Sequence, residues 1–156
     1  MAARPALSPR IRKASNCKGA YSTVIPQSGG QITWQIGGEG YDMVLSGQVP
    51  ATIMAKLPSN LKAILNGRKQ ESIQHWAVHP GGRTILDAVQ KSLGLSSEAL
   101  RFSRDVLRRF GNLSSATIMF VLEAIMRPDV PAGNGCALAF GPGVCLESLL
   151  FHKESA

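Results

Sequence analysis

Hydrophobic and polar residues alternate along two short segments in the first third of the chain, residues 31–36 and 41–45. Alternation with a period of two residues is typical of a β-strand that buries one face. The tetrapeptide Gly37-Gly38-Glu39-Gly40 separates the two segments and supplies the residue types that a tight turn requires. The pattern therefore predicts a β-hairpin.

Apolar residues recur at the 3.6-residue spacing of amphipathic helices over three further segments, 49–65, 83–93 and 96–110. A glycine follows each segment within two residues, which favours a helix end at that point. Pro58 lies inside the first segment and should kink or split that helix, because proline has no N–H to donate to the preceding turn.

The segment 116–126 carries a single charged side chain, Glu123, and is apolar on nearly all sides, which predicts a central, buried helix. Short apolar runs predict buried strands at 73–78, 135–140 and 144–151. Gly141-Pro142-Gly143 joins the last two strands in a C-terminal β-hairpin. Strands that alternate with helices indicate an α/β layer structure with a mixed sheet.

The turn His79-Pro80-Gly81-Gly82 lies between the strand at 73–78 and the helix that begins at Arg83. Ligands bind at the carboxyl ends of strands in open α/β sheets, and glycines allow a substrate to approach the backbone closely. A helix N-terminus can also hold an anion. The turn is therefore a candidate ligand site, and a hydrogen-bonded structural histidine is the competing interpretation.

The chain of 156 residues is long enough for one domain or for one half of a larger one. Its formal net charge is +7, and no acidic residue precedes Glu39. A solvated N-terminus, a targeting segment and contact with an anionic partner all remain open for the basic lead-in, residues 1–20. Arginines of the segment 96–110 indicate a solvated helix face rather than a nucleic-acid surface, since neither an aromatic platform nor a binding motif accompanies them.

No apolar run approaches the roughly 20 residues that a membrane span needs, so we expect none. The three cysteines, Cys17, Cys136 and Cys145, have neither the number nor the spacing of a zinc site, and free thiols indicate a cytoplasmic protein. We expect no metal and no bound cofactor. His75 and His152 have no evident partners in the sequence and are not expected to be ligands.

His79 and Asn112 together suggest a specific chemistry. Asn112 alone, just before a predicted helix, is also a candidate cap, and the Gly-Pro-Gly segment alone is a candidate hairpin turn. An imidazole N–H and a carboxamide NH₂ are neutral donors, and two such donors aimed at one oxygen form an oxyanion hole for a thioester carbonyl. A histidine can also maintain a neighbouring cysteine as thiolate.

Three motifs, His79-Pro80-Gly81-Gly82, Gly111-Asn112-Leu113-Ser114-Ser115-Ala116 and Phe140-Gly141-Pro142-Gly143, occur in the order and spacing of the type III polyketide synthases. From about Tyr21 to Phe151 the chain resembles the C-terminal half of the chalcone and stilbene synthase family. The resemblance implies a C-terminal thiolase-like half over residues 21–156, with a mixed sheet, packed helices and one buried central helix.

The resemblance also implies roles for individual residues. His79 corresponds to the family's catalytic histidine, and Asn112 to its partner in malonyl decarboxylation. Ser114 corresponds to a residue of the initiation pocket, and the loop Phe140, Gly141, Pro142 and Gly143 to the loop that shapes the cyclisation cavity. The substrates implied are acyl-CoA and malonyl-CoA thioesters, and the family forms homo-oligomers.

Two positions depart from the family pattern. Ala139 replaces the glycine that usually precedes the loop phenylalanine. Met43 lies where plant enzymes carry a gatekeeping phenylalanine. A flexible, slimmer methionine would widen the passage to the cavity, which suggests a starter unit other than coumaroyl, such as a fatty acyl chain.

The family's nucleophilic cysteine belongs to the N-terminal half, which this sequence does not show. We expect that the chain is completed by a separate N-terminal half, pairs with a second copy, or is a truncated form that is inactive alone. The favoured function is an acyltransferase domain that joins a starter acyl-CoA to malonyl-CoA, and the alternative is a catalytically inactive thiolase-like interaction domain.

Overall fold

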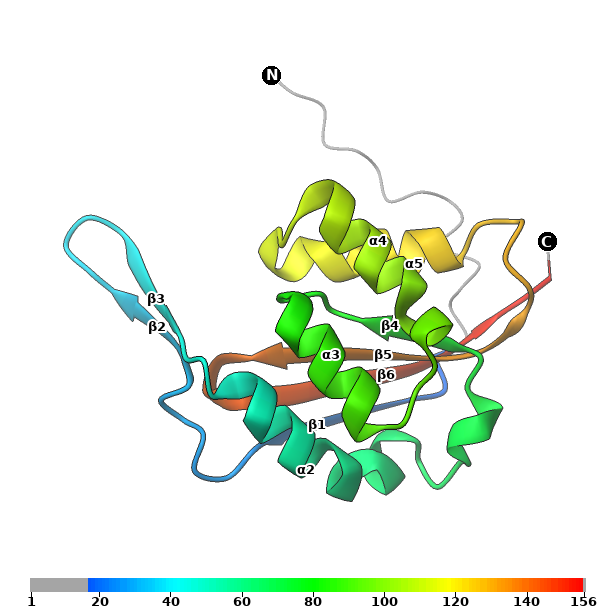
Figure 1. The fold of residues 1–156 in the computed structure, drawn as a ribbon, viewed down its shortest axis with the longest axis horizontal. Coiled ribbons are helices and arrows are strands. Elements are labelled where there is room, and N and C mark those ends of the chain that lie inside the picture. The colour runs from blue at the N-terminus through cyan, green and yellow to red at the C-terminus, as the bar shows by residue number, and fades with distance from the viewer. Residues whose placement is uncertain (1–16, 156) are drawn as a thin grey trace.

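Residues 17–155 are described by a computed structural model, in which a four-stranded sheet, a separate β-hairpin and four α-helices are arranged as Figure 1 shows. The strands and helices are β1 (Gly19–Val24), β2 (Ile32–Ile36), β3 (Tyr41–Leu45), α2 (Val49–Ile64), β4 (His75–Val78), α3 (Arg83–Ser92), α4 (Arg101–Phe110), α5 (Thr117–Ile125), β5 (Gly133–Gly141) and β6 (Cys145–Lys153). None of the described helices is long and apolar enough to cross a membrane.

The sheet has the strand order β1-β6-β5-β4 and is mixed, as the sequence predicts. β4 runs parallel to β5, whereas β5 with β6 and β6 with β1 are antiparallel. Trp76 lies opposite Cys136, and Cys136 lies opposite Leu150, so these three side chains share one face. The helices α2 and α3 cover that face and form the main core with it.

The second face of the sheet is covered by α5 over β4 and β5. Val121 and Ile125 of α5 are fully buried against small side chains such as Ala77 and Ala137. The predicted central helix packs against the sheet through Thr117, Val121 and Ile125, whereas Phe120 is 37% exposed and stacks on Phe110 of α4. Part of the apolar surface of α5 is therefore only half-buried in the described chain.

The helix α2 continues through Pro58, so the helix is not split there. Proline removes the N–H that would bond to the carbonyl of Met54. Both residues are on the exposed side of α2, so water can satisfy that carbonyl. The predicted helix end is confirmed, because Asn66 and Gly67 have left-handed backbone with φ of 49° and 74°.

The strand β1 was not predicted, and it begins at Gly19 inside the segment that the sequence assigns to an irregular lead-in. Its burial alternates between half-buried and exposed residues, which leaves little apolar pattern to detect. Pairing with β6 makes it a strand, with Gly19 opposite Leu150 and Val24 opposite Cys145. Residues 1–16 of the predicted lead-in lie outside the described residues.

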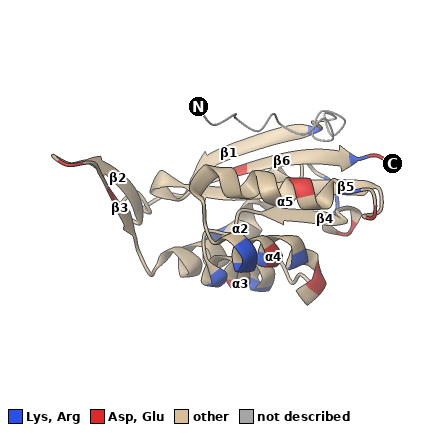
Figure 2. Ribbon diagram, turned by 90° about the horizontal axis from the view of Figure 1, so that it is seen from above, with Lys and Arg blue, Asp and Glu red and all other residues tan. Residues whose placement is uncertain are grey.

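The predicted hairpin is confirmed, with β2 and β3 antiparallel and Trp34 opposite Met43. It extends from the end of the main sheet instead of joining it (Figures 1 and 2). Trp34, Met43 and Leu45 are about half exposed, and Ile36 is 86% exposed. Such apolar exposure on one hairpin is typical of a surface that another polypeptide covers.

Gly135 of β5 lies under the ring of Phe151, and a Cβ atom at this position would overlap the ring. We expect Gly135→Ala to lower the free energy of unfolding by about 1–3 kcal/mol, because Phe151 is buried and must shift. Gly38→Ala is the matched control, since a Cβ there meets no atom within 4 Å. Urea unfolding of the three chains measures the difference, and equal stability of the two variants would contradict the packing argument.

Candidate active site

The parallel pairing of β4 and β5 brings two of the sequence motifs to one edge of the sheet. The backbone N–H of His79 donates to the carbonyl of Leu138 at 2.7 Å, which continues the ladder past the end of β4. The residues that follow Leu138 on β5 lead directly into Phe140 and Gly141. Since parallel strands end on the same side, the histidine turn and the Gly-Pro-Gly loop meet there.

Asn112 reaches the same edge from the end of α4. Its Nδ2 donates to the carbonyl of Gly81 at 3.2 Å, and its Oδ1 accepts the backbone N–H of Ser114 at 3.0 Å. These partners determine the orientation of the amide, because only the NH₂ group can donate to a carbonyl. Ser114 takes a left-handed backbone with φ of 58°, which aims its N–H at Asn112. The second hydrogen of Nδ2 is left for a ligand.

These residues line one cavity of about 460 Å³. Among the residues that the sequence assigns to the site, the cavity is lined by Met43, His79, Asn112, Ser114, Phe140, Gly141 and Pro142. Gly143 does not line it. Its carbonyl instead accepts a hydrogen bond from the hydroxyl of Ser28 at 2.7 Å, and its φ of 70° turns the chain into β6. Gly143 therefore contributes to the turn.

The hairpin forms one wall of the cavity, which sequence reasoning predicted only for Met43. Ile32 and Leu45 are cross-strand partners, as are Trp34 and Met43, and all four side chains line the cavity. The period-two pattern places these residues on one face of the hairpin. Nothing in the pattern itself shows that this face turns toward His79.

Glu147 is a further cavity residue whose position the sequence did not reveal. Its Oε1 accepts a hydrogen bond from the Ser22 hydroxyl at 2.6 Å and from the Cys145 thiol at 3.2 Å. The strands β1 and β6 thus hold a carboxylate at the wall of an otherwise mainly apolar cavity. Alternation along β6 places Glu147 on the second face of the sheet, which gives the only sequence signal for it.

Burial lowers the pKa of His79 below the ordinary value of 6.5. The imidazole is therefore neutral near pH 7, with one nitrogen as donor and the other as acceptor. Gly81 borders the ring, since a Cβ at position 81 would lie 3.8 Å from His79 Cδ2. A larger side chain there would extend into the space beside the imidazole.

The described thiols do not provide a nucleophile for this site. Burial raises the pKa of Cys136 to about 12, and it lies in the core between β4 and β6. Burial and then the neighbouring Glu147 raise the pKa of Cys145. Cys17 is exposed and does not line the cavity. Thiolate chemistry requires a lowered pKa, so Cys136 and Cys145 are not suited to it, and Cys17 lies away from the site.

The other two histidines have structural partners that the sequence did not predict. His75 Nε2 lies 3.0 Å from the carbonyl of Pro131, and His152 Nδ1 lies 3.0 Å from Oδ1 of Asn134. Within residues 17–155, no group of three His, Cys, Asp or Glu side chains could hold a metal ion.

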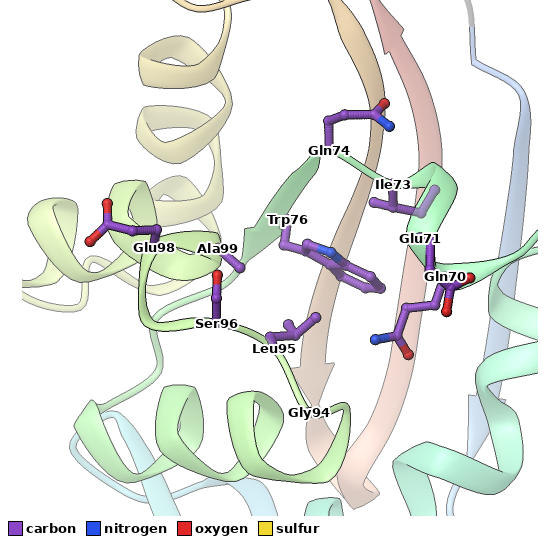
Figure 3. A pocket seen from close by; sticks show the side chains of 10 residues that line it. All are labelled: Gln70, Glu71, Ile73, Gln74, Trp76, Gly94, Leu95, Ser96, Glu98 and Ala99. Atoms are coloured by element: carbon purple, nitrogen blue, oxygen red, sulfur yellow. The ribbon is translucent and has the colours of Figure 1, made fainter.

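A second hollow, of about 350 Å³, lies at the opposite end of β4 around Trp76 (Figure 3). Its amide side chains are used in structural contacts: Gln70 donates to the carbonyl of Leu93 at 2.7 Å, and Gln74 accepts the N–H of Asn134 at 2.8 Å. Trp76 lines the hollow but is only 3% exposed. This hollow lies between η1 (Gln70–Ser72) and the turn after α3, and its titratable lining residues are the carboxylates Glu71 and Glu98.

Comparison with known proteins agrees with the cavity and its motifs. The chain is 34% identical over 139 residues to Alpha-pyrone synthesis polyketide synthase-like Pks18 of Mycobacterium tuberculosis, an alignment that covers 86% of this chain and 35% of the relative. Among solved structures, PKS-I of the brown alga Ectocarpus siliculosus is 29% identical with a TM-score of 0.80, over 87% of this chain and 38% of that one.

The C-terminal type III polyketide synthase domain of Steely1 from Dictyostelium shares the fold, with a TM-score of 0.80 and 23% identity over 88% of this chain and 40% of that one. The chain spans between 35% and 41% of the length of the curated relatives it matches. Residues 16–154 match the family model of chalcone and stilbene synthases, C-terminal domain. The chain therefore belongs to the chalcone and stilbene synthase family and corresponds to its C-terminal domain.

Proposed function

We propose that this chain forms the C-terminal part of a type III polyketide synthase that joins a starter acyl-CoA to malonyl-CoA by decarboxylative Claisen condensation. The observation that supports this best is the meeting of His79 and Asn112 at one mainly apolar cavity, with both groups neutral. Membership of the polyketide synthase family supports the same reaction class.

The carbonyl oxygen of a malonyl thioester would accept hydrogen bonds from the His79 imidazole N–H and from the free hydrogen of Asn112 Nδ2. As the bond between the α-carbon and the carboxylate breaks, carbon dioxide leaves and its bonding electrons form the enolate, whose negative charge develops on that carbonyl oxygen. The two donors stabilise this charge more strongly than the neutral carbonyl, which lowers the barrier.

The enolate carbon would then attack the carbonyl of a starter acyl group held as a thioester on a cysteine. That attack forms the new carbon–carbon bond and releases the cysteine thiolate, which a neighbouring imidazole stabilises. We assign the cysteine to an N-terminal half, because the thiols of residues 17–155 have raised pKa values or lie away from the cavity.

Exposed apolar residues of the hairpin and of α5 support the pairing of this chain with such a half. The same surface favours the alternative that the chain is an inactive interaction domain. Complementation distinguishes the two. The N-terminal half of the Mycobacterium tuberculosis relative, added to this chain, should restore release of carbon dioxide from malonyl-CoA. No release with any Cys-bearing half would favour the interaction domain.

His79 provides a test that needs only this chain. Because burial lowers its pKa in the folded state, the unfolded chain binds more protons just below pH 6.5, and His79 therefore contributes stability that is lost as the pH falls through that range. We expect an NMR titration of the imidazole to give a midpoint below 6.5. A midpoint at or above 6.5 would show that the imidazole is not held in a desolvated site.

Removing either oxyanion donor should slow decarboxylation in the complemented protein. We expect Asn112→Ala and His79→Ala each to lower the rate of carbon dioxide release by roughly 10²–10³-fold, the usual cost of one oxyanion-hole donor. His152→Gln is the matched control, because His152 lies outside the cavity beside Asn134. A loss in the control as large as in the two cavity variants would point to a general folding defect instead.

Met43 should set the size of the starter unit, because it lies on the cavity face of the hairpin. In Met43→Phe we expect the kcat/KM ratio of a long fatty acyl-CoA to a short acyl-CoA to fall about tenfold, as the ring narrows the passage. Val44→Phe adds the same ring on the other face of the hairpin and should leave the ratio unchanged. An unchanged starter profile in Met43→Phe would contradict the hypothesis that Met43 sets the size of the starter unit.

A further inference from the structure

Glu147 is the only charged side chain among the described residues that line the reaction cavity. The proposed condensation employs His79 and Asn112 and does not use this carboxylate. Once the proposed N-terminal half covers the cavity, a carboxylate against apolar walls is unfavourable unless it is hydrogen-bonded or binds a ligand. The two oxygens of Glu147 differ in this respect.

One carboxylate oxygen of Glu147 is held by its neighbours and the other is not. Oε1 accepts the hydroxyl of Ser22 at 2.6 Å and the thiol of Cys145 at 3.2 Å. Burial, followed by the hydrogen bond to Glu147, raises the pKa of Cys145, which keeps that thiol protonated as a donor. Oε2 has no hydrogen-bond partner among residues 17–155. The strands therefore fix one oxygen and leave the other for a ligand.

The register of the sheet places Glu147 and His79 on the same face. The N–H of His79 donates to the carbonyl of Leu138, so His79 continues the parallel ladder and lies beside Ala139. Ala139 in turn lies opposite Glu147 on β6. Because one strand separates them and neighbouring strands are about 4.8 Å apart, the backbones of His79 and Glu147 are about 10 Å apart.

The side chain between His79 and Glu147 is small. Ala139 lines the cavity and contributes only a methyl group to the floor between the imidazole and the carboxylate. A thioester whose carbonyl oxygen is bound at His79 can therefore extend its acyl chain over Ala139 toward Oε2 of Glu147.

The free oxygen of Glu147 restricts which chain fits there. An ionised carboxylate accepts hydrogen bonds and has none to donate. An aliphatic chain against Oε2 would remove water from this oxygen without replacing the lost hydrogen bond, which is unfavourable. A chain with a hydroxyl group at that point would donate its O–H to the carboxylate. Sites built to bind a substrate hydroxyl discriminate strongly against the analogue that lacks it.

We propose that Glu147 selects a starter acyl chain that carries a hydroxyl group, and that Oε2 accepts the O–H of this group. The substrate class rests on the proposed function. The hydroxyl belongs within about 10 Å of the thioester carbonyl, because a single strand separates Glu147 from His79. Glu147 thus contacts the substrate and sets its specificity, whereas the reacting atoms stay at His79 and Asn112.

The complemented protein tests this selection with octanoyl-CoA and its 4-, 6- and 8-hydroxy derivatives. We expect kcat/KM for one of the hydroxylated starters to exceed that for octanoyl-CoA by roughly tenfold, and Glu147→Leu to abolish this preference. Glu147→Gln keeps an oxygen for Ser22 and Cys145 but loses the charge. The preference should therefore fall about fivefold in this variant, while the contacts between β1 and β6 are retained.

Glu71→Gln is the matched control. It removes the same charge from the hollow around Trp76, at the opposite end of β4, and we expect its starter preference to be unchanged. Three results would overturn the proposal: no preference for any hydroxylated starter, the same preference in the Glu147 variants as in the unsubstituted chain, or an equal loss of kcat/KM with all starters. The last result would indicate a purely structural role for Glu147.

Binding to the chain alone separates this proposal from the proposed function. The N-acetylcysteamine thioesters of octanoic acid and of the preferred hydroxyoctanoic acid serve as probes. We expect the hydroxyl to lower Kd roughly two- to threefold, because water competes for the exposed carboxylate, and Glu147→Leu to remove this advantage.

If the chain shows this advantage but the complemented protein carries out no condensation, the proposed function fails and the hydroxyl selection stands. If condensation occurs with the same starter preference in the unsubstituted chain and in the Glu147 variants, the selection fails alone.

Discussion

The hydrogen bond from Asn112 to the carbonyl of Gly81 joins two segments that are 31 residues apart in the chain. One end of that bond belongs to the turn that carries His79, and the other to the loop between α4 and α5. A second bond, from the N–H of Ser114 to the Asn112 carbonyl oxygen, positions the amide from its other side. Both bonds determine the direction in which Asn112 presents its remaining N–H. They also connect the start of α3 to the end of α4.

The sheet beneath this bond supplies rigidity. The parallel pair β4 and β5 is buried, with Val78 and Leu138 essentially inaccessible to solvent, and the chain leaves both strands at one edge. Small residues, Ala77 and Ala137, let α5 approach the second face closely. A site built at the end of such strands needs little reorganisation when charge develops on a bound oxygen, which is the condition for electrostatic stabilisation.

Among residues 17–155, one wall of the cavity consists of apolar side chains that are only partly covered. Trp34 and Met43 on the hairpin are half exposed, although their alternating pattern is that of a buried strand face. The outer side of α5 has the same character. Apolar surface of this kind contributes stability only when it is covered. The N-terminal half that we propose as a partner would cover this surface.

The sequence by itself determined the helices, the hairpin and the C-terminal strands, because apolar periodicity indicates each element and glycines mark where it ends. It also determined the family, because three motifs occur in a fixed order. It did not determine that β1 is a strand, since its burial pattern is weak and pairing with β6 creates it. The sequence also predicted that Pro58 interrupts α2. The helix continues, because water can satisfy the free carbonyl on its exposed side.

Only the tertiary structure decided that the hairpin face belongs to the cavity, and that Glu147 lies across Ala139 from His79. The physical reason is that periodicity reports which face of an element is apolar or charged, whereas the packing of distant elements decides what that face meets.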